Sequence, residues 1–204
     1  HRGLIRKQFQ VADLLARRRW NGLLLLVCSH YFYRQFGFDY LLPLGGGWQL
    51  AADLVPESPS GAGVRLDVRA ADLEGDMPGL QRMYSAAVGG LCVASDLNEA
   101  IWRYQEAKPK AWADRQITYV VESEGVASGF VRLFADDLPG RAERLRITGA
   151  HAPDRQVALA ILRFARKLAL EERQEPIIDA RIPVSTPLTR LIEELGGKPK
   201  GSYA

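Results

Sequence analysis

The sequence is poor in the residues from which metal sites and disulfide frameworks are built. Its 204 residues include two cysteines and three histidines, and Cys28 and Cys92 do not stand at the spacing of metal ligands or of a disulfide framework. A strong excess of charge of one sign is missing as well, because the net charge is only +3 and basic residues are spread among acidic ones. We therefore expect no metal and no nucleic acid partner, and a reducing cytoplasm as the compartment.

Long apolar runs are also absent from the sequence. None approaches the roughly 20 residues that a helix needs to span a bilayer, and the first residues lack the order of charge, apolar stretch and cleavage site of a signal peptide. The composition, with 47% hydrophobic and 25% charged residues, is that of a globular protein. A chain of this length can form one large domain or two small ones, and we expect it to have no membrane partner.

The aromatic stretch 31–40 (YFYRQFGFDY) is the most informative part of the sequence. It lies between two apolar runs, 23–27 and 41–44, a pattern that predicts a buried strand, a short helical turn and a second strand. Gly37 can take the positive φ that ends such a turn. Tyr33, on the turn and near the strand ends, is a candidate for chemistry. The alternative is that it packs in a core, as most aromatic side chains do.

The first residues open a helical pattern with basic side chains at its start. Apolar residues fall at helical spacing over Leu4–Arg19, before the apolar run and the aromatic stretch. The order of a helix, an apolar strand and the pattern Tyr-x-x-x-Gly-Phe at residues 33–38 resembles the closing half of an acetyltransferase of the GCN5-related N-acetyltransferase (GNAT) superfamily.

In this family the pattern Arg/Gln-x-x-Gly-x-Gly/Ala holds the pyrophosphate of coenzyme A through backbone N–H groups, and the dipole of the following helix favours the same negative charge. Gly3 matches the first glycine of the pattern and Ile5 replaces the second small residue. The match to the leading Arg/Gln would lie before His1. The resemblance implies acetyl-CoA as the cosubstrate and Gly3, Ile5 and Arg6 as its contacts. For Arg6 the alternative is an exposed charge near the helix start.

The same resemblance implies that Tyr33 is a general acid. Acyl transfer from a thioester to an amine ends with a coenzyme A thiolate that benefits from a proton. A phenol, with a reference pKa near 10, is protonated at neutral pH and can supply that proton. Tyr31 is the weaker alternative, and the resemblance identifies no general base.

A segment rich in proline, glycine and serine, residues 56–63, has the composition of an exposed linker. Before it, we expect residues 48–55 to return as a hairpin strand against residues 38–44. After it, the sequence patterns predict the beginning of a second domain, with a strand, two helices, a hairpin around Glu124 and Gly125, and a further strand. This order again resembles the GNAT superfamily, now its opening half.

The second copy departs from the family pattern at two places. Residues 155–160 (RQVALA) fall on the phosphate-binding pattern with Ala158 in place of the first glycine, which puts a methyl group where a backbone N–H should approach a phosphate. Ile192 stands where the tyrosine would be. Arg155, Ala158 and Ala160 are therefore the weaker candidates for cofactor binding. The second copy is predicted to be a degenerate structural partner.

The sequence thus predicts an α/β (α+β) fold with a mixed, mostly antiparallel, twisted sheet flanked by helices. A partial GNAT-like copy is expected over 1–55, a linker over 56–63 and a nearly complete copy over 64–204. The implied activity is acetyl transfer from acetyl-CoA to a small-molecule or peptide amine, and a homodimer is left open.

Two alternatives to this activity remain. One is a non-catalytic acyl-CoA-binding or interaction module that keeps the fold without the chemistry. The other is an unrelated α/β protein with an accidental Tyr-x-x-x-Gly-Phe pattern. A sheet whose fourth and fifth strands do not splay apart around a cofactor cleft would support the latter.

Overall fold

The computed structural model describes most of the chain. The residues described are 3–19, 32–39, 44–57, 66–109, 115–134, 144–172, 176–183 and 185–203. The chain divides into two compact units between Pro43 and Leu44. We call residues 1–43 the first unit and residues 44–203 the second unit.

The first unit contains the helix α1 (Leu4–Arg18) and the short 3-10 helix η2 (Arg34–Phe36). Two arginines lie in the last turn of α1, where positive charge meets the negative end of the helix dipole. Gly37 ends η2 with a φ of 86°, as predicted. The strand predicted over 23–27 lies outside the described residues.

Phe9 joins α1 to the aromatic turn around η2. Its ring centroid lies 5.6 Å from that of Tyr33, 4.9 Å from that of Phe36 and 5.2 Å from that of Phe38. The contacts with Tyr33 and Phe38 are edge-to-face, an arrangement that aromatic rings prefer. The aromatic residues predicted around the turn therefore form a small cluster with the first helix.

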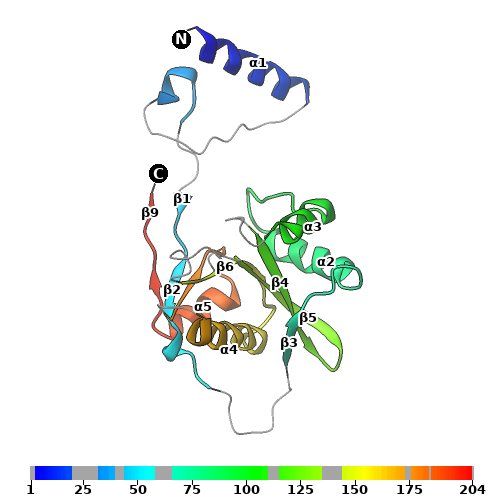
Figure 1. Ribbon diagram of the computed structural model, residues 1–204. Coiled ribbons are helices and arrows are strands. Elements are labelled where there is room, and N and C mark those ends of the chain that lie inside the picture. The colour runs from blue at the N-terminus through cyan, green and yellow to red at the C-terminus, as the bar shows by residue number, and fades with distance from the viewer. Residues whose placement is uncertain are drawn as a thin grey trace. The chain divides into compact units, whose positions relative to one another are not determined.

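The second unit is built on a seven-stranded sheet (Figure 1). Its strands lie in the order β3 (Asp67–Ala70), β4 (Gln116–Ser123), β5 (Val126–Phe134), β6 (Leu145–His151), β7 (Ile177–Ala180), β2 (Trp48–Ala51) and β8 (Lys198–Pro199). Neighbouring strands are antiparallel except for the parallel pair β6 and β7. A separate two-stranded sheet joins β1 (Leu44–Gly45) to β9 (Ser202–Tyr203). The mixed, mostly antiparallel sheet confirms the predicted fold class.

Helices cover both faces of this sheet (Figure 1). The helices of the main core are α4 (Arg155–Glu172) and α5 (Pro187–Glu194), and those of a smaller core on the other face are α2 (Met77–Val88) and α3 (Glu99–Ala107). Successive side chains of a strand point to opposite faces. Accordingly, Val121 of β4 belongs to the main core and Val120 to the smaller core, which also holds Trp102.

The strand β2 lies between β7 and β8 although it precedes the linker in sequence. Leu50 of β2 pairs with Ile178 of β7, and Leu50, Ala52 and Val55 are all buried in the main core. The predicted hairpin between residues 48–55 and 38–44 is therefore wrong, because both neighbours of β2 come from later in the chain. Its apolar face is buried under α4 and α5, so the end of the predicted first copy belongs to the second unit.

The strand β6 pairs with β7 only over the first part of β6. Residues 145–147 lie opposite residues 178–180 in parallel register. The register between β5 and β6 shifts at Thr148, and such a bulge bends a strand. Residues 148–151, all of them described, do not pair with β7. The fourth strand of the second copy thus continues beyond its pairing with the fifth, which is consistent with the GNAT-like interpretation.

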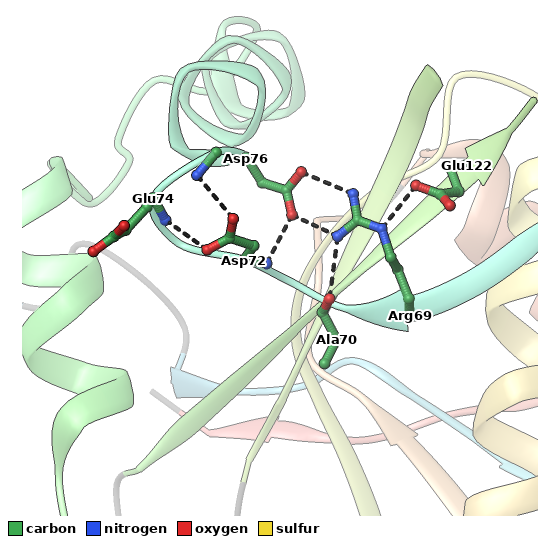
Figure 2. A network of polar contacts seen from close by, with 7 residues as sticks. Arg69, Ala70, Asp72, Glu74, Asp76 and Glu122 are labelled. Atoms are coloured by element: carbon green, nitrogen blue, oxygen red, sulfur yellow. Dashed lines mark hydrogen bonds and ion pairs between the residues drawn. The ribbon is translucent and has the colours of Figure 1, made fainter. Parts of the chain in front are cut away.

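Arg69 of β3 ties the first strand of the second copy to the start of α2 (Figure 2). Its Nη1 and Nη2 donate to the two carboxylate oxygens of Asp76 at 2.7 and 2.9 Å, and its Nε donates to Glu122 of β4 at 2.8 Å. The hydrogen bonds from Arg69 lower the pKa of the Asp76 carboxyl below its usual value. This network fixes the helix α2 to the sheet.

Replacing Asp76 by asparagine is expected to lower the free energy of unfolding by about 2 kcal/mol at neutral pH, because the charged hydrogen bonds to Arg69 are lost. Since the pKa of Asp76 is lower in the folded chain, its contribution is present above the unfolded pKa and is lost as pH falls through the folded pKa. The Asp76→Asn chain should therefore lose less stability below about pH 4 than the parent. Urea unfolding at several pH values measures both effects. The exposed Asp53 is the control. If Asp53→Asn lowered the free energy of unfolding as much as Asp76→Asn does, the network around Arg69 would not be the source of the stability.

Candidate functional site

The N-terminus of α1 is open to an anion. Gly3 is its N-cap and provides no capping side chain, and the first turn has no acidic residue. A Cβ atom at Gly3 would meet no heavy atom within 4 Å, so a ligand can approach the backbone closely. Arg6 and Lys7 lie in this first turn and are exposed. Uncapped N–H groups, a helix dipole and two cations all favour negative charge here.

This helix N-terminus and the turn with Tyr33 belong to the same small cluster. The Arg6 guanidinium lies 5.8 Å from the centroid of the Phe36 ring, and Phe9 contacts Tyr33 one helical turn further along α1. Tyr33 itself is half-buried at the N-cap of η2. The first unit thus holds Arg6 and the predicted general acid against the same aromatic cluster, and Ile5 is half-buried in the first turn of α1. Tyr31 lies outside the described residues.

The N-terminus of α4 in the second unit is already capped. Asp154 Oδ1 accepts from the N–H groups of Gln156 and Val157 at 2.8 and 2.9 Å. The carboxylate therefore takes the donors that would hold a phosphate and adds a negative charge at the same place. The Arg155 side chain pairs with Glu194 of α5 at 2.9 Å.

The other predicted residues of the second copy are packing residues. Ala158 and Ile192 are fully buried in the main core, and Ala160 is half-buried against it. The methyl group of Ala158 therefore contacts other apolar side chains and not a ligand. Ile192 carries no proton to donate. Its Cγ2 would lie 2.4 Å from a Cβ atom at Gly197, so its place in the core is tightly filled.

The structure shows a polar cluster that the sequence did not predict. Arg132 of β5 is only 5% exposed, and its guanidinium lies 4.5 Å from the centroid of the Trp102 ring. Its Nη1 donates to Gln105 Oε1 at 3.1 Å and its Nε donates to Thr118 Oγ1 at 3.3 Å. Burial lowers the pKa of Arg132 to about 10, so it stays charged at neutral pH.

Thr118 links this cation to an acid. Its hydroxyl donates to Glu106, and it accepts from Trp102 Nε1 at 2.9 Å. The Trp102 Nε1 also donates to Glu106 Oε1 at 3.1 Å. The acid, the hydroxyl and the indole therefore form one hydrogen-bonded group against which Arg132 packs.

Two further ionisable side chains with altered pKa values lie beside this group. Burial lowers the pKa of His151, whose ring stacks on that of Phe130 at 6.5 Å. Burial also raises the pKa of Tyr84, which feels the charge of Arg132. Such groups gather at functional sites more often than elsewhere. The sequence signal was present, because Arg132 stands inside the otherwise apolar run Phe130–Phe134.

Within the part of the chain that the structure describes, no group of three or more His, Cys, Asp or Glu side chains is arranged to hold a metal ion. Among the same residues, none of the helices combines the length and hydrophobicity that crossing a bilayer requires.

Comparison with known proteins identifies the fold. No protein-family model and no curated protein sequence matches the chain. Solved structures do. A GCN5-related N-acetyltransferase from Anabaena variabilis matches 98% of this chain with a TM-score of 0.65 and 15% sequence identity. A protein from Enterococcus faecalis, described as a conserved protein of unknown function and probable N-acyltransferase, matches 97% with a TM-score of 0.61 and 12% identity.

The chain therefore has the GNAT fold, which confirms at the level of the fold the resemblance carried by its sequence. It spans about half the length of both solved structures, 48% of the first and 46% of the second.

Proposed function

We propose that the protein is an N-acetyltransferase that uses acetyl-CoA, with the coenzyme held by the first unit. The observation that carries this proposal is the contrast between the two helix N-termini. The N-terminus of α1 begins at Gly3 with no capping side chain and no acidic residue in its first turn. The N-terminus of α4 is occupied by the Asp154 carboxylate.

The residues of the first unit fit the cofactor that the fold implies. Gly3 leaves room for a phosphate to approach the backbone, and Arg6 and Lys7 supply positive charge. Acetyl-CoA, when bound, supplies an acetyl group activated as a thioester. A phenol has a reference pKa near 10, which suits Tyr33 to donate a proton to the departing sulfur. The Phe9 ring packs against Tyr33 and orients it. The acceptor is proposed to be a small-molecule or peptide amine.

A second candidate function is a non-catalytic acyl-CoA-binding or interaction module. Two features of the second unit favour this function. The Asp154 carboxylate caps the N-terminus of α4, and the buried Ile192 stands where the family pattern has a tyrosine. On the proposal made here, these features make the second unit a structural partner of a catalytic first unit. On the alternative, neither unit catalyses acyl transfer.

Isothermal titration with acetyl-CoA tests where the coenzyme binds. Replacing Gly3 by aspartate copies the Asp154 cap into the first unit, and we expect it to weaken binding on the order of tenfold or more through repulsion and loss of N–H donors. An aspartate at this position caps a helix well and meets open space, so α1 should remain folded. The uncharged Gly3→Asn chain is the size-matched control and should bind more tightly than Gly3→Asp.

The reciprocal variant, Asp154→Asn, is expected to bind acetyl-CoA as the parent does. A Gly3→Asp chain that binds normally would place the coenzyme elsewhere and defeat the proposal. Absence of binding by the parent chain itself would favour an interaction module that has lost the cofactor.

A further inference from the structure

One nitrogen of Arg132 is buried without a hydrogen-bond partner. Its Nη2 atom is shielded from solvent and donates to no acceptor among the residues that the structure describes, while Nε donates to Thr118 and Nη1 to Gln105. A buried donor left unpaired costs free energy, so such an atom in a folded protein calls for a physical explanation. The planar guanidinium presents N–H donors in a fixed geometry that suits carboxylate oxygens.

The nearby acid does not satisfy this nitrogen. The carboxylate of Glu106 accepts from Thr118 and Trp102 and acts on Arg132 only through its charge. The protein therefore holds the guanidinium through Nε and Nη1, and no described residue accepts a hydrogen bond from Nη2, which is left for a single further acceptor.

Arg166 of α4 provides a useful contrast. It also has a buried nitrogen without a partner, its Nε, but its Nη2 forms an ion pair with Glu57 at 2.8 Å. An unpaired arginine nitrogen alone does not indicate a ligand. Arg132 differs because it is almost wholly buried and has no carboxylate in direct contact among the described residues.

Apart from the polar partners Thr118, Gln105 and Glu106, Arg132 lies beside apolar side chains. The smaller core beside it consists of the buried side chains Met77, Leu80, Trp102, Val120 and Phe130. A ligand that reaches Nη2 from this side needs one negative oxygen and an apolar remainder, since a second charge would be buried without a counter-ion.

The helix α3 provides the means of access. Trp102 is its one buried side chain, and this ring is also the one that covers the guanidinium. Few buried apolar contacts mark an element that opens at low cost in free energy. Movement of α3 away from the sheet would uncover the guanidinium, at the cost of the hydrogen bond from Trp102 to Thr118.

We propose that the second unit binds a small apolar carboxylate, whose oxygen accepts from Arg132 Nη2 at the edge of the smaller core between α2, α3 and the sheet. This site does not depend on the proposed acetyl-CoA site, because it lies in the other unit and uses other residues. It gives the second unit a ligand of its own.

Butyrate is the probe that tests this site, in the full chain. We expect butyrate at tenfold excess over its dissociation constant to raise the unfolding temperature by about 4 °C and to change tryptophan fluorescence. Butyramide has the same shape without the charge, and sodium chloride or phosphate at equal ionic strength has the charge without the apolar chain. None of the three should reproduce the effect.

The matched variants are Arg132→Met and Arg166→Met, each of which removes an arginine with an unpaired nitrogen. The response to butyrate should vanish in the first and persist in the second. Arg132→Lys keeps the charge without the planar guanidinium and should bind at least tenfold more weakly, which tests the site even if Arg132→Met does not fold.

Three outcomes would overturn the proposal. One is a parent chain that does not respond to butyrate. Another is a response that persists in Arg132→Met, because binding would then lie elsewhere. The third is an equal response to phosphate or chloride, which would make the site one for an inorganic anion.

Discussion

A chain that begins at residue 64 is expected to show no cooperative unfolding transition, whereas a chain that begins at residue 44 should unfold cooperatively. The difference between them is the segment that contains β2, which forms the sheet between β7 and β8. Its loss removes Leu50, Ala52 and Val55 from the main core. Truncating a single buried leucine costs about 2 to 5 kcal/mol, and a domain has only about 5 to 15 kcal/mol of stability.

Hydrogen bonding adds to this effect. Without β2, the inner edges of β7 and β8 would present unpaired backbone groups beside an exposed apolar surface, which favours aggregation. Circular dichroism during heating and size-exclusion chromatography measure the outcome. The shorter chain folding with the same midpoint as the longer one would show that β2 is dispensable. Adding a peptide of residues 44–57 should restore the transition in the shorter chain.

Replacing Tyr33 by phenylalanine is expected to lower the turnover of acetyl-CoA with an amine by about a hundredfold or more, because a positioned general acid contributes about 10² to 10⁴ in rate. The phenylalanine ring keeps the edge-to-face contact with Phe9, so the cluster around η2 should stay intact. Binding of acetyl-CoA should change little, since the proton is needed only as the thiolate leaves. Release of the coenzyme A thiol, followed with a panel of primary amines, measures the rate.

Tyr104 of α3 supplies the control for this substitution, because it is 60% exposed and lies in the other unit. The Tyr104→Phe chain should keep the parent rate. Unchanged turnover in the Tyr33→Phe chain would remove the acid role from Tyr33, leave it as a packing aromatic, and make Tyr31 the next residue to replace.

The two substitutions probe different parts of the proposed function. Gly3→Asp acts on cofactor binding, and Tyr33→Phe acts on the chemical step. A protein that binds acetyl-CoA through Gly3 but is indifferent to Tyr33→Phe would be a coenzyme-binding module. A protein sensitive to both would be the acetyltransferase proposed here.

Local patterns in the sequence determined the elements and their order. The helix expected at Leu4–Arg19 is observed over Leu4–Arg18, and Glu124 and Gly125, which were expected at a hairpin turn, have positive φ. Gly37 ends its turn as expected. These features depend on interactions between residues close in the chain, such as helical hydrogen bonds and the freedom of glycine at positive φ. The order of elements, together with the Tyr-x-x-x-Gly-Phe pattern at residues 33–38, was sufficient to predict the GNAT fold.

Tertiary structure alone decided which strand completes which sheet and which helix N-terminus is open. An apolar strand such as Trp48–Ala51 buries its side chains equally well against any suitable sheet, so its sequence does not reveal its neighbours. Asp154 becomes a cap, and Arg132 a buried cation without a full set of partners, only once segments distant in sequence pack around them. Hydrophobic pattern is local, whereas burial, pairing and electrostatics depend on what the rest of the chain brings into contact.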